Sequence, residues 1–336
     1  MRGGTAIQEL VEPMITGKPY PIKGLIAYGC NLFHTLPNVA RTKDALKNLD
    51  FVMVVDTLPQ DHVAWADVVL PEATYLERHD ELWVCGHKTP YIALREPAVE
   101  PYAQTKPAWW MIRELGLRLG LDDFFKWKNA EEYLNERLKS IGLTVEKLHA
   151  QDGIAIQKGK AYLADFEKEG GVPFATASGK IEFYSDALEK SKLDPLPKYE
   201  PTPDVPAGFF RLLYGRSPVH TFSRTQNTPL LNELMPENEV WLNADVAKQL
   251  GIADGQRVMI ENQDGAKSGP VKVKATQRIR KDCVFMVHGF GHDTPGMKRA
   301  HKRGASDAVL QTKYKLDPIS GGAGLRVNFV KLVREA

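Results

Sequence analysis

Residues 51–71 read FVMVVDTLPQDHVAWADVVLP, and this stretch decides the fold. Its first five residues are a continuous apolar run, and residues 67–70 form a second strand-like segment that stops at Pro71. Such runs are typical of strands that are covered on both faces, as in a parallel sheet. Because a short helical segment separates the two runs, the stretch predicts a strand–helix–strand unit.

A further strand and two helices are predicted before this stretch. Residues 23–28 are a short apolar run, and the spacing of apolar residues predicts helices at 5–17 and 38–48. Ligands of parallel sheets bind outside the carboxyl ends of the strands. Those ends are here the segments Gly29-Cys30-Asn31 and Asp56-Thr57 and the residues after Pro71.

Two helices are predicted in the middle of the chain, and residues 151–185 have a mixed pattern. Amphipathic spacing predicts helices at 109–121 and 130–141. Alternation of apolar and polar residues predicts a strand in GKIEFYS at 179–185. Residues 193–206 contain five prolines, which indicates a linker.

The chain after residue 207 changes in character. Short apolar segments alternate with glycine and aspartate turns, which is typical of a β-barrel or a β-sandwich. The sequence predicts strands at 209–214, 240–242, 257–261, 271–275, 284–287 and 325–330, and a helix at 244–250 that ends at Gly251.

The composition is that of an ordinary globular protein, and a length of 336 residues predicts two domains. Hydrophobic residues make up 43% and charged residues 26%, and the net charge is +2. A charge near neutrality argues against a nucleic-acid or membrane-surface binder, which normally carries a basic stripe. No apolar run reaches about 18 residues, so no transmembrane helix is predicted. The first residues lack the apolar core of a secretory signal.

The cysteines give no sign of a metal or redox centre. Cys30, Cys85 and Cys283 are far apart in the sequence, so there is no C-x-x-C pair. Because three cysteines cannot form a complete disulfide framework, separate and mostly buried thiols are predicted.

A polar loop interrupts the barrel-like part at residues 211–231, RLLYGRSPVHTFSRTQNTPLL. A short strand ends at Gly215, and the loop then carries two arginines, one histidine and several hydroxyl and amide groups. Such a density of donors suits a large, polar, anionic ligand. The alternative is a solvated surface loop.

Three charged residues around the first sheet are candidates for nucleotide recognition. Asp56 could accept two N–H bonds from the edge of a guanine, or it could cap the following helix. Arg78 could bind a phosphate with two parallel hydrogen bonds, and Lys106 could act as a point charge. The alternative for both is an ordinary exposed charge.

The histidines are weaker candidates. His220 could donate to a ligand, act as a base or be a satisfied loop residue, and no carboxylate at fixed spacing favours catalysis. His288 and His292 stand four residues apart in HGFGH, but the two glycines disfavour a helix, so the i, i+4 metal geometry is not expected. No metal site is predicted.

Five motifs in order resemble the C-terminal half of a molybdopterin oxidoreductase of the dimethyl sulfoxide reductase superfamily. The loop sequence GRSPVHTFSRTQN, together with VHGFGH, is most similar to the catalytic subunits of thiosulfate and polysulfide reductases. The motifs are GCNLFHTLPN, VVDTLPQDHVAWADVVLPEATYLER, SGKIEFYS, YGRSPVHTFSRT and WLNADVAKQLGIADGQRVMIEN.

The resemblance implies a fold class of α/β type with two parts. Residues 1–192 would be part of a Rossmann-like α/β molybdopterin-binding domain, and residues 193–206 would be the proline-rich linker. Residues 207–336 would be a molybdopterin dinucleotide-binding β-barrel of six strands and double-psi type.

The cofactor implied by the resemblance is molybdenum bis(molybdopterin guanine dinucleotide). Asp56 takes the position that reads guanine, and Ala108 departs from an aspartate that contacts the cofactor in many relatives. The cofactor-binding residues carried over are Cys30, Asn31, Asp56, Thr57, Arg78, Lys106, Gly215, Arg216, Ser217, His220, Thr221, Ser223, Phe290, Asp307 and Asn328.

The resemblance also implies parts that precede residue 1. Relatives carry an N-terminal cysteine cluster for a 4Fe-4S centre and then a ligand to the metal, and none of the three cysteines here is proposed as that ligand. The chain is therefore expected to be a fragment or a split product. Incomplete sheets should leave apolar edges exposed.

The function implied is reduction of thiosulfate or polysulfide, a small inorganic sulfur substrate, by the complete enzyme, with the fragment alone inactive. The alternatives are a relative acting on formate, nitrate or arsenate, and a non-catalytic cofactor-binding protein. The resemblance implies an iron–sulfur electron-transfer subunit and a membrane anchor subunit as partners, with no nucleic acid. It implies a periplasmic location for the full-length protein.

Overall fold

The computed structural model describes residues 7–86, 89–156, 170–171, 174–196, 198–317 and 320–334. The chain folds as two compact units. Met1–Leu70 and Thr202–Ala336 form the first unit, and Pro71–Pro201 form the second. This grouping differs from the three predicted segments, because the first seventy residues pack with the barrel. The predicted domain bounds, at 192 and 207, stay a prediction.

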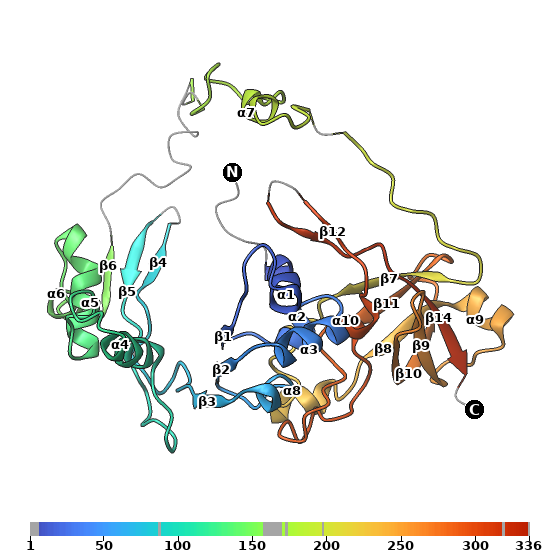
Figure 1. Ribbon diagram of the computed structural model, residues 1–336, viewed down its shortest axis with the longest axis horizontal. Helices are drawn as coiled ribbons and strands as arrows, with labels where there is room; N and C mark the ends of the chain where they lie inside the picture. Colours follow the sequence, from blue (N-terminus) through green and yellow to red (C-terminus); the bar gives the residue numbers. More distant parts are fainter. Residues whose placement is uncertain are drawn as a thin grey trace. The chain divides into compact units, whose positions relative to one another are not determined.

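The first unit begins with the predicted α/β layer (Figure 1). Strands β1 and β2 pair in parallel, from Gly24 opposite Phe51 to Tyr28 opposite Val55, and β3 completes a sheet of order β1-β2-β3. The α/β class predicted from residues 51–71 is therefore confirmed. The elements are α1 (Ile7–Thr16), β1 (Gly24–Tyr28), α2 (Leu32–Thr35), α3 (Val39–Lys47), β2 (Phe51–Asp56), the 3-10 helix η1 (Val63–Trp65) and β3 (Val68–Pro71).

The rest of the first unit is a closed barrel of six strands, in the order β10-β8-β11-β7-β14-β9. The predicted six-stranded barrel is confirmed. Its interior is apolar, with Val240, Leu242, Ile260 and Val284 fully buried. The elements are β7 (Phe210–Gly215), α8 (Pro229–Leu234), β8 (Glu239–Asn243), α9 (Ala244–Leu250), β9 (Arg257–Asn262), β10 (Lys267–Thr276), β11 (Cys283–Val287), α10 (Asp307–Leu310), the β12–β13 pair (Lys315–Leu316, Ala323–Gly324) and β14 (Phe329–Arg334).

The last barrel strand begins later than the predicted strand at 325–330. Asn328 is fully buried, and its amide group donates to the carbonyl oxygens of Lys313 and Leu325. These bonds hold the preceding residues in a loop, so β14 pairs with β9 only from Val330 onward.

A shared core joins the α/β layer to the barrel within this unit. Ala308 of α10 packs among Leu32 and Phe33 of α2 and Val54 of β2. These side chains are all buried, so α10 belongs as much to the first layer as to the barrel. The carboxyl ends of β1 and β2 are thereby brought beside the loops that follow β11.

The second unit is smaller and has its own apolar core. An antiparallel sheet of order β4-β5-β6 packs on α5 and α6 through Ile92, Leu134, Leu138 and Leu148. The elements are β4 (Trp83–Cys85), β5 (Tyr91–Ala93), α4 (Ala108–Arg118), α5 (Ala130–Leu138), the 3-10 helix η2 (Lys139–Ile141), α6 (Val145–His149), β6 (Ile154–Ile156) and α7 (Asp186–Lys190).

The predicted strand at 179–185 is wrong. The segment forms turns and bends, and Phe183 is 82% exposed. Alternation of apolar residues makes a strand only where a neighbouring strand accepts its hydrogen bonds. In the described part of the chain, no strand pairs with this segment.

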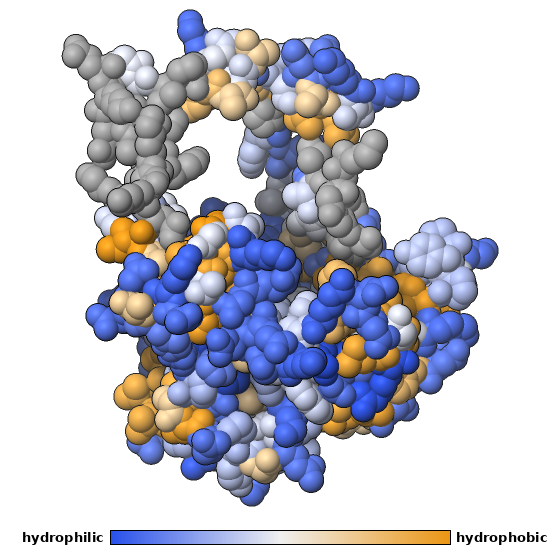
Figure 2. Space-filling model, turned by 90° about the vertical axis from the view of Figure 1, so that its left-hand side faces the viewer, coloured by the Kyte–Doolittle hydropathy of each residue, from blue (hydrophilic) through white to orange (hydrophobic). Residues whose placement is uncertain are grey.

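Apolar side chains are exposed at the strands of both units. Ile26 of β1 and Val69 of β3 are more than 40% exposed in the first unit, as are Val84 of β4 and Ile156 of β6 in the second. Figure 2 shows such apolar patches among hydrophilic side chains on one face. Exposed apolar sheet surface was predicted, and the described residues show it. Within these residues, none of the helices combines the length and the hydropathy that crossing a membrane requires.

We predict that Asn238→Ala will destabilise the chain. The side chain is fully buried, donates to the carbonyl oxygens of Val287 and Ala305, and accepts from the backbone N–H of Ala305. Its removal leaves buried backbone groups without partners, which should lower the free energy of unfolding by about 2–3 kcal/mol. Urea denaturation followed by fluorescence measures this change.

The matched control is Gln249→Ala, which removes an amide from an exposed position of α9. It should change the unfolding free energy by less than about 0.5 kcal/mol. Equal effects of the two substitutions would contradict the role given to Asn238.

Candidate functional site

The carboxyl ends of β1 and β2 meet at one edge of the sheet, as predicted. The backbone N–H of Gly29 donates to the carbonyl oxygen of Val55, at 3.0 Å. Burial raises the pKa of the Cys30 thiol above its ordinary value, and the nearby charge of Asp56 raises it further. Cys30 is therefore a half-buried thiol near the carboxylate of Asp56.

Asp56 and Thr57 form a tight turn at this edge. One carboxylate oxygen of Asp56 accepts from the backbone N–H groups of Thr57, at 2.7 Å, and Leu58, at 3.2 Å. Thr57 is exposed, whereas Asp56 is partly buried. The turn orients the carboxylate, which is what recognition of a flat base edge requires.

Asn31, by contrast, serves the fold. Its side-chain oxygen caps α2 by accepting from the backbone N–H of Phe33. Its amide nitrogen donates to Gln60, at 3.0 Å, and to Asp61, at 3.3 Å. The side chain is buried with its donors and acceptor in use, so it holds α2 against the loop after β2.

Asp61 is the centre of the most connected polar cluster of the first unit. His34 and His292 donate to the same carboxylate oxygen, at 3.2 and 2.7 Å. The other oxygen accepts the backbone N–H groups of Asp293 and Thr294, at 2.7 and 3.0 Å. With the bond from Asn31, five donors converge on one buried carboxylate. We call Asp61, His34 and His292 the Asp61 hub.

Electrostatics in the hub favour an ionised Asp61 beside a neutral His34. Burial by itself would raise the pKa of Asp61, but hydrogen bonds from His292 and His34 hold it well below its ordinary value. Burial lowers the pKa of His34. Burial also lowers the pKa of the neighbouring His62, to about 4.

The hub is the described cluster that comes nearest to a metal site, since its possible ligand atoms lie within 4.8 Å of one another. Histidines that bind metals normally donate their second ring nitrogen to an acceptor. Here Nδ1 of His34 and Nε2 of His292 are buried without a partner. Both rings also point a nitrogen at one oxygen, so the arrangement fits a hydrogen-bond centre better than a metal site.

The HGFGH motif places its two histidines on different acids. His292 contacts Asp61, whereas Nδ1 of His288 lies 3.0 and 2.9 Å from the two carboxylate oxygens of Asp307. The glycines between them have positive φ, of 94° at Gly289 and 79° at Gly291. A Cβ at either would overlap neighbouring backbone, so these positions need glycine. The expectation that the pair does not chelate one metal agrees with this geometry.

The predicted ligand loop after β7 has an inward side. His220 is buried, and its ring nitrogens lie 3.1 Å from the hydroxyl of Thr225 and 2.8 Å from the carbonyl oxygen of Met235. Its ring also packs on the buried ring of Phe290, with centroids 5.2 Å apart. Of the three roles considered for His220, the structure therefore fits that of a loop histidine whose hydrogen bonds are all made within the protein.

The loop also has an outward side. Arg216 is exposed and stacks over the ring of Phe222, at 4.7 Å from its centroid. Thr221 is exposed as well, whereas Ser217 is partly buried and Ser223 is buried. Arg216 and Thr221 are therefore the members of the predicted set that the loop offers to a ligand.

Three other predicted residues are used inside the unit. A Cβ at Gly215 would lie 2.9 Å from the ring of Phe285, so this glycine is needed for packing. Asn328 holds the loop before β14, as described above. Asp307 is fully buried and is shared by His288 and Gln311. Contact of the whole predicted set with a cofactor stays a prediction.

Arg78 and Lys106 belong to the second unit. Arg78 is largely buried and forms an ion pair with Glu72, and it donates to the carbonyl oxygen of Ala73. Lys106 is exposed, and its ammonium lies 5.6 Å from the ring centroid of Trp110. Lys106 is thus available to an anion, whereas Arg78 already carries a structural ion pair.

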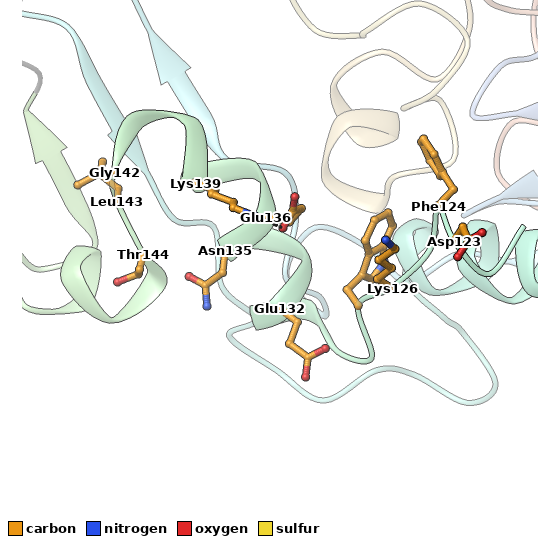
Figure 3. A pocket seen from close by; sticks show the side chains of 11 residues that line it. Asp123, Phe124, Lys126, Glu132, Asn135, Glu136, Lys139, Gly142, Leu143 and Thr144 are labelled. Carbon is orange, nitrogen blue, oxygen red and sulfur yellow. Dashed lines mark ion pairs between the residues drawn. The ribbon is translucent and has the colours of Figure 1, made fainter.

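The second unit also contains a groove that the sequence did not predict. It has a volume of about 830 Å³ and lies between α5 and the segment after α4 (Figure 3). Glu132 and Glu136 point from α5, and Lys126 and Phe124 come from the other side. These side chains carry mixed charge without convergence on a point, so we assign the groove no chemistry.

Sequence reasoning missed the Asp61 hub and the role of His288. Asp61 follows the end of the strand predicted at 51–55 by six residues, and its main partner His292 is 231 residues away. The HGFGH motif was a usable signal, because paired glycines around a histidine indicate a constrained loop. The acids that its two histidines contact, Asp61 and Asp307, could not be predicted from sequence spacing.

We predict that Asp61→Asn will destabilise the chain strongly. An amide cannot accept from all five donors, and its own N–H groups would face donors. Breaking a buried charged centre of this kind should lower the free energy of unfolding by at least about 3 kcal/mol. Chemical denaturation at pH 7 measures it, with Asp293→Asn as the exposed, charge-matched control.

The same pair of variants should respond to acid in a defined direction. Because the folded-state pKa of Asp61 is depressed, its stabilisation is fully present above the unfolded-state pKa, near 4, and is lost as the pH falls below it. The stability gap between wild type and Asp61→Asn should therefore be constant from pH 5 to 8 and narrow below about pH 4. A gap that does not narrow in acid would contradict the ionised state.

Comparison with known proteins supports the reading of both parts. Residues 5–118 match the family described as "Molybdopterin oxidoreductase", and residues 210–329 match the family described as "Molydopterin dinucleotide binding domain". The two matches together include the α/β layer and nearly all of the barrel.

Individual relatives align over almost the whole chain. The thiosulfate reductase molybdopterin-containing subunit PhsA of Salmonella typhimurium is 32% identical over 95% of this chain and 44% of its own length. Acetylene hydratase of Syntrophotalea acetylenica is 30% identical over 94% of this chain and 44% of its own. Dimethyl sulfoxide reductase DmsA of Escherichia coli is 27% identical over 93% and 42%.

A solved structure agrees with these sequences. Acetylene hydratase from Pelobacter acetylenicus superposes with a TM-score of 0.78 at 26% identity, over 97% of this chain and 46% of that one. The chain spans less than half the length of the relatives it matches. The chain therefore carries the molybdopterin oxidoreductase domain and the molybdopterin dinucleotide-binding domain of this superfamily.

Proposed function

We propose that this chain supplies part of the binding site for a molybdenum bis(molybdopterin guanine dinucleotide) cofactor in an oxidoreductase. The observation that carries the proposal is the oriented carboxylate of Asp56 at the carboxyl edge of a parallel sheet. Such edges are where α/β sheets bind nucleotides. The two family matches support a molybdopterin dinucleotide as the ligand.

The donor set of the first unit fits such a group. A guanine presents two adjacent N–H donors, which suit a carboxylate, and the phosphates and the pterin require cations and hydrogen-bond donors. The outward residues Arg216 and Thr221 supply these after β7. When bound, the cofactor would supply two-electron redox chemistry at molybdenum. The side chains of this chain bind it, orient it and shield it from water.

We propose thiosulfate or polysulfide as the substrate of the holoenzyme. The supporting observation is the similarity to a thiosulfate reductase subunit, at 32% identity, together with the VHGFGH and GRSPVHTFSRTQN motifs. An iron–sulfur subunit, a membrane anchor subunit and a periplasmic location belong to the same proposal. A 4Fe-4S cluster elsewhere in the enzyme is also part of it.

A second candidate is a hydration rather than a reduction, since acetylene hydratase is nearly as similar in sequence and matches in structure. The discriminating measurement uses the holoenzyme that contains this chain. Reduced viologen dye should be oxidised by thiosulfate or polysulfide faster than by dimethyl sulfoxide or nitrate, with no hydration of acetylene. Acetylene hydration without dye oxidation would overturn the reductase proposal.

We predict that Asp56→Asn will weaken the binding of guanine nucleotides by about 1.5–3 kcal/mol, because a charged hydrogen bond to the base is lost. Calorimetric titration of the chain with GDP measures this. ADP binding serves as the reference, since adenine lacks the two adjacent donors. The proposal fails if GDP and ADP bind alike to the wild type, or if the substitution leaves the preference for guanine intact.

A further inference from the structure

His288 and Asp307 form a dyad where β11 ends, and only Asp307 of the two carries a role implied by the resemblance. The dyad lies at this strand end, since the backbone N–H of His288 still donates to the carbonyl oxygen of Gly215 at the end of β7. Asp307 comes from α10, whose apolar side packs on the first sheet. Three elements therefore meet at this point of the first unit (Figure 1).

The carboxylate of Asp307 cannot reach a ligand by itself. Its side chain is fully buried, and its oxygens are occupied by His288 and by Gln311, whose amide donates at 2.7 Å. A wholly buried carboxylate requires a compensating charge. In the described contacts, His288 is the only ionisable donor that touches it. The ion pair therefore favours the protonated imidazole.

The imidazole of His288 is placed so that its positive charge can contact a ligand. Its Nδ1 is engaged by Asp307, so Nε2 is the nitrogen that remains for a ligand. The side chain keeps 18% of its surface exposed, whereas His292 is fully buried. Burial alone would lower the pKa of His288, but the hydrogen bond and the charge of Asp307 raise it above its ordinary value.

A second cation, Arg216, contacts the same aromatic ring that His288 contacts. The ring of Phe222 meets His288 edge-on, with centroids 6.3 Å apart, and carries the guanidinium of Arg216 over its face. The carbonyl oxygen of Phe222 lies against Gly289, where a Cβ would overlap it. The backbone of Phe222 is thus held against the loop after β11, and both cations contact the ring that it carries.

The groups that face His288 from each neighbouring element are few. They are Tyr214 on β7, Phe222 on the loop, Asp307 on α10, and His34 on α2, which is itself bonded to Asp61. Arg216 lies over the ring of Phe222. His34 is held neutral by burial, and burial together with Asp307 raises the pKa of Tyr214. The phenol and the second imidazole therefore stay uncharged near pH 7, so the outward charge comes from His288 and Arg216.

We propose that His288, held as an imidazolium by Asp307, binds a phosphoryl anion together with Arg216. The ligand class is a pyrophosphate such as the one that joins the two halves of a dinucleotide, and this identification rests on the proposed function. The role carried over to Asp307 changes accordingly. Asp307 is a positioning residue that acts through His288, rather than a residue that touches the cofactor.

The test compares wild type with His288→Asn by calorimetric titration with inorganic pyrophosphate, from pH 5.5 to 9 at constant ionic strength. The Asn amide can keep the bond to Asp307 while it removes Nε2 and the charge. At pH 6 the variant should bind pyrophosphate at least about tenfold more weakly, as expected for loss of one charged hydrogen bond. The difference should vanish as the pH rises through the raised pKa of His288, because the wild type then loses its cation.

A direct readout separates binding from folding. The imidazole resonances of His288, assigned by their loss in His288→Asn, should titrate above the ordinary value near 6.5, and pyrophosphate should raise that midpoint further. Asp307→Asn should lower the midpoint in the absence of any ligand. The control His149→Asn, at an exposed position of the second unit, should bind like the wild type at every pH.

Each outcome bears on one idea. A difference between wild type and His288→Asn that does not change with pH, or a His288 midpoint that pyrophosphate leaves unmoved, overturns the phosphoryl site. Pyrophosphate binding with the expected pH dependence, but without any preference for GDP over ADP, supports the site and counts against the proposed guanine recognition. GDP binding that depends on Asp56 but not on His288 supports the proposed guanine recognition and counts against the phosphoryl site.

Discussion

The buried carboxylate of Asp61 is the constraint on which the first unit depends. An ionised acid inside a protein is tolerated only when donors surround it, and here five donors from two stretches of chain surround the acid of a third. Those stretches are α2, the turn after β2 and the loop after β11. The hub therefore fixes the barrel loops against the carboxyl edge of the parallel sheet, where a nucleotide would bind.

Two acid–histidine contacts in this region have opposite properties. At Asp61 one carboxylate is shared by two imidazoles that are almost fully buried, so neither ring is offered to a ligand and the contact is structural. At Asp307 one carboxylate is shared by one partly exposed imidazole and an amide, so a positive charge can face outward. The glycines of HGFGH make both contacts possible, because they let the backbone turn between two neighbouring segments. A single short motif thus serves the stability of the unit and also supplies the histidine of the proposed phosphoryl site.

The predicted cofactor residues separate into two groups by what their side chains do. One group is buried with its polar atoms paired, so its side chains hold the surrounding loops in place: Asn31, His220, Asp307 and Asn328. Asp56, Thr57, Arg216 and Thr221 are partly or fully exposed. A resemblance carries over positions in a motif, but it does not distinguish a side chain that touches a ligand from one that holds the loop. That distinction requires burial and hydrogen bonds.

The sequence by itself determined the local elements: the apolar runs of β1 and β2, the short strands of the barrel and most helix ends. These follow from periodicity and capping, which act over a few residues. It failed at 179–185, where alternation had no partner strand. Only the tertiary structure decided that the first seventy residues pack with the barrel, that His288 and His292 choose different acids, and that Asp61 is a centre. These contacts join residues far apart in the chain, and sequence spacing carries no information about which of them meet.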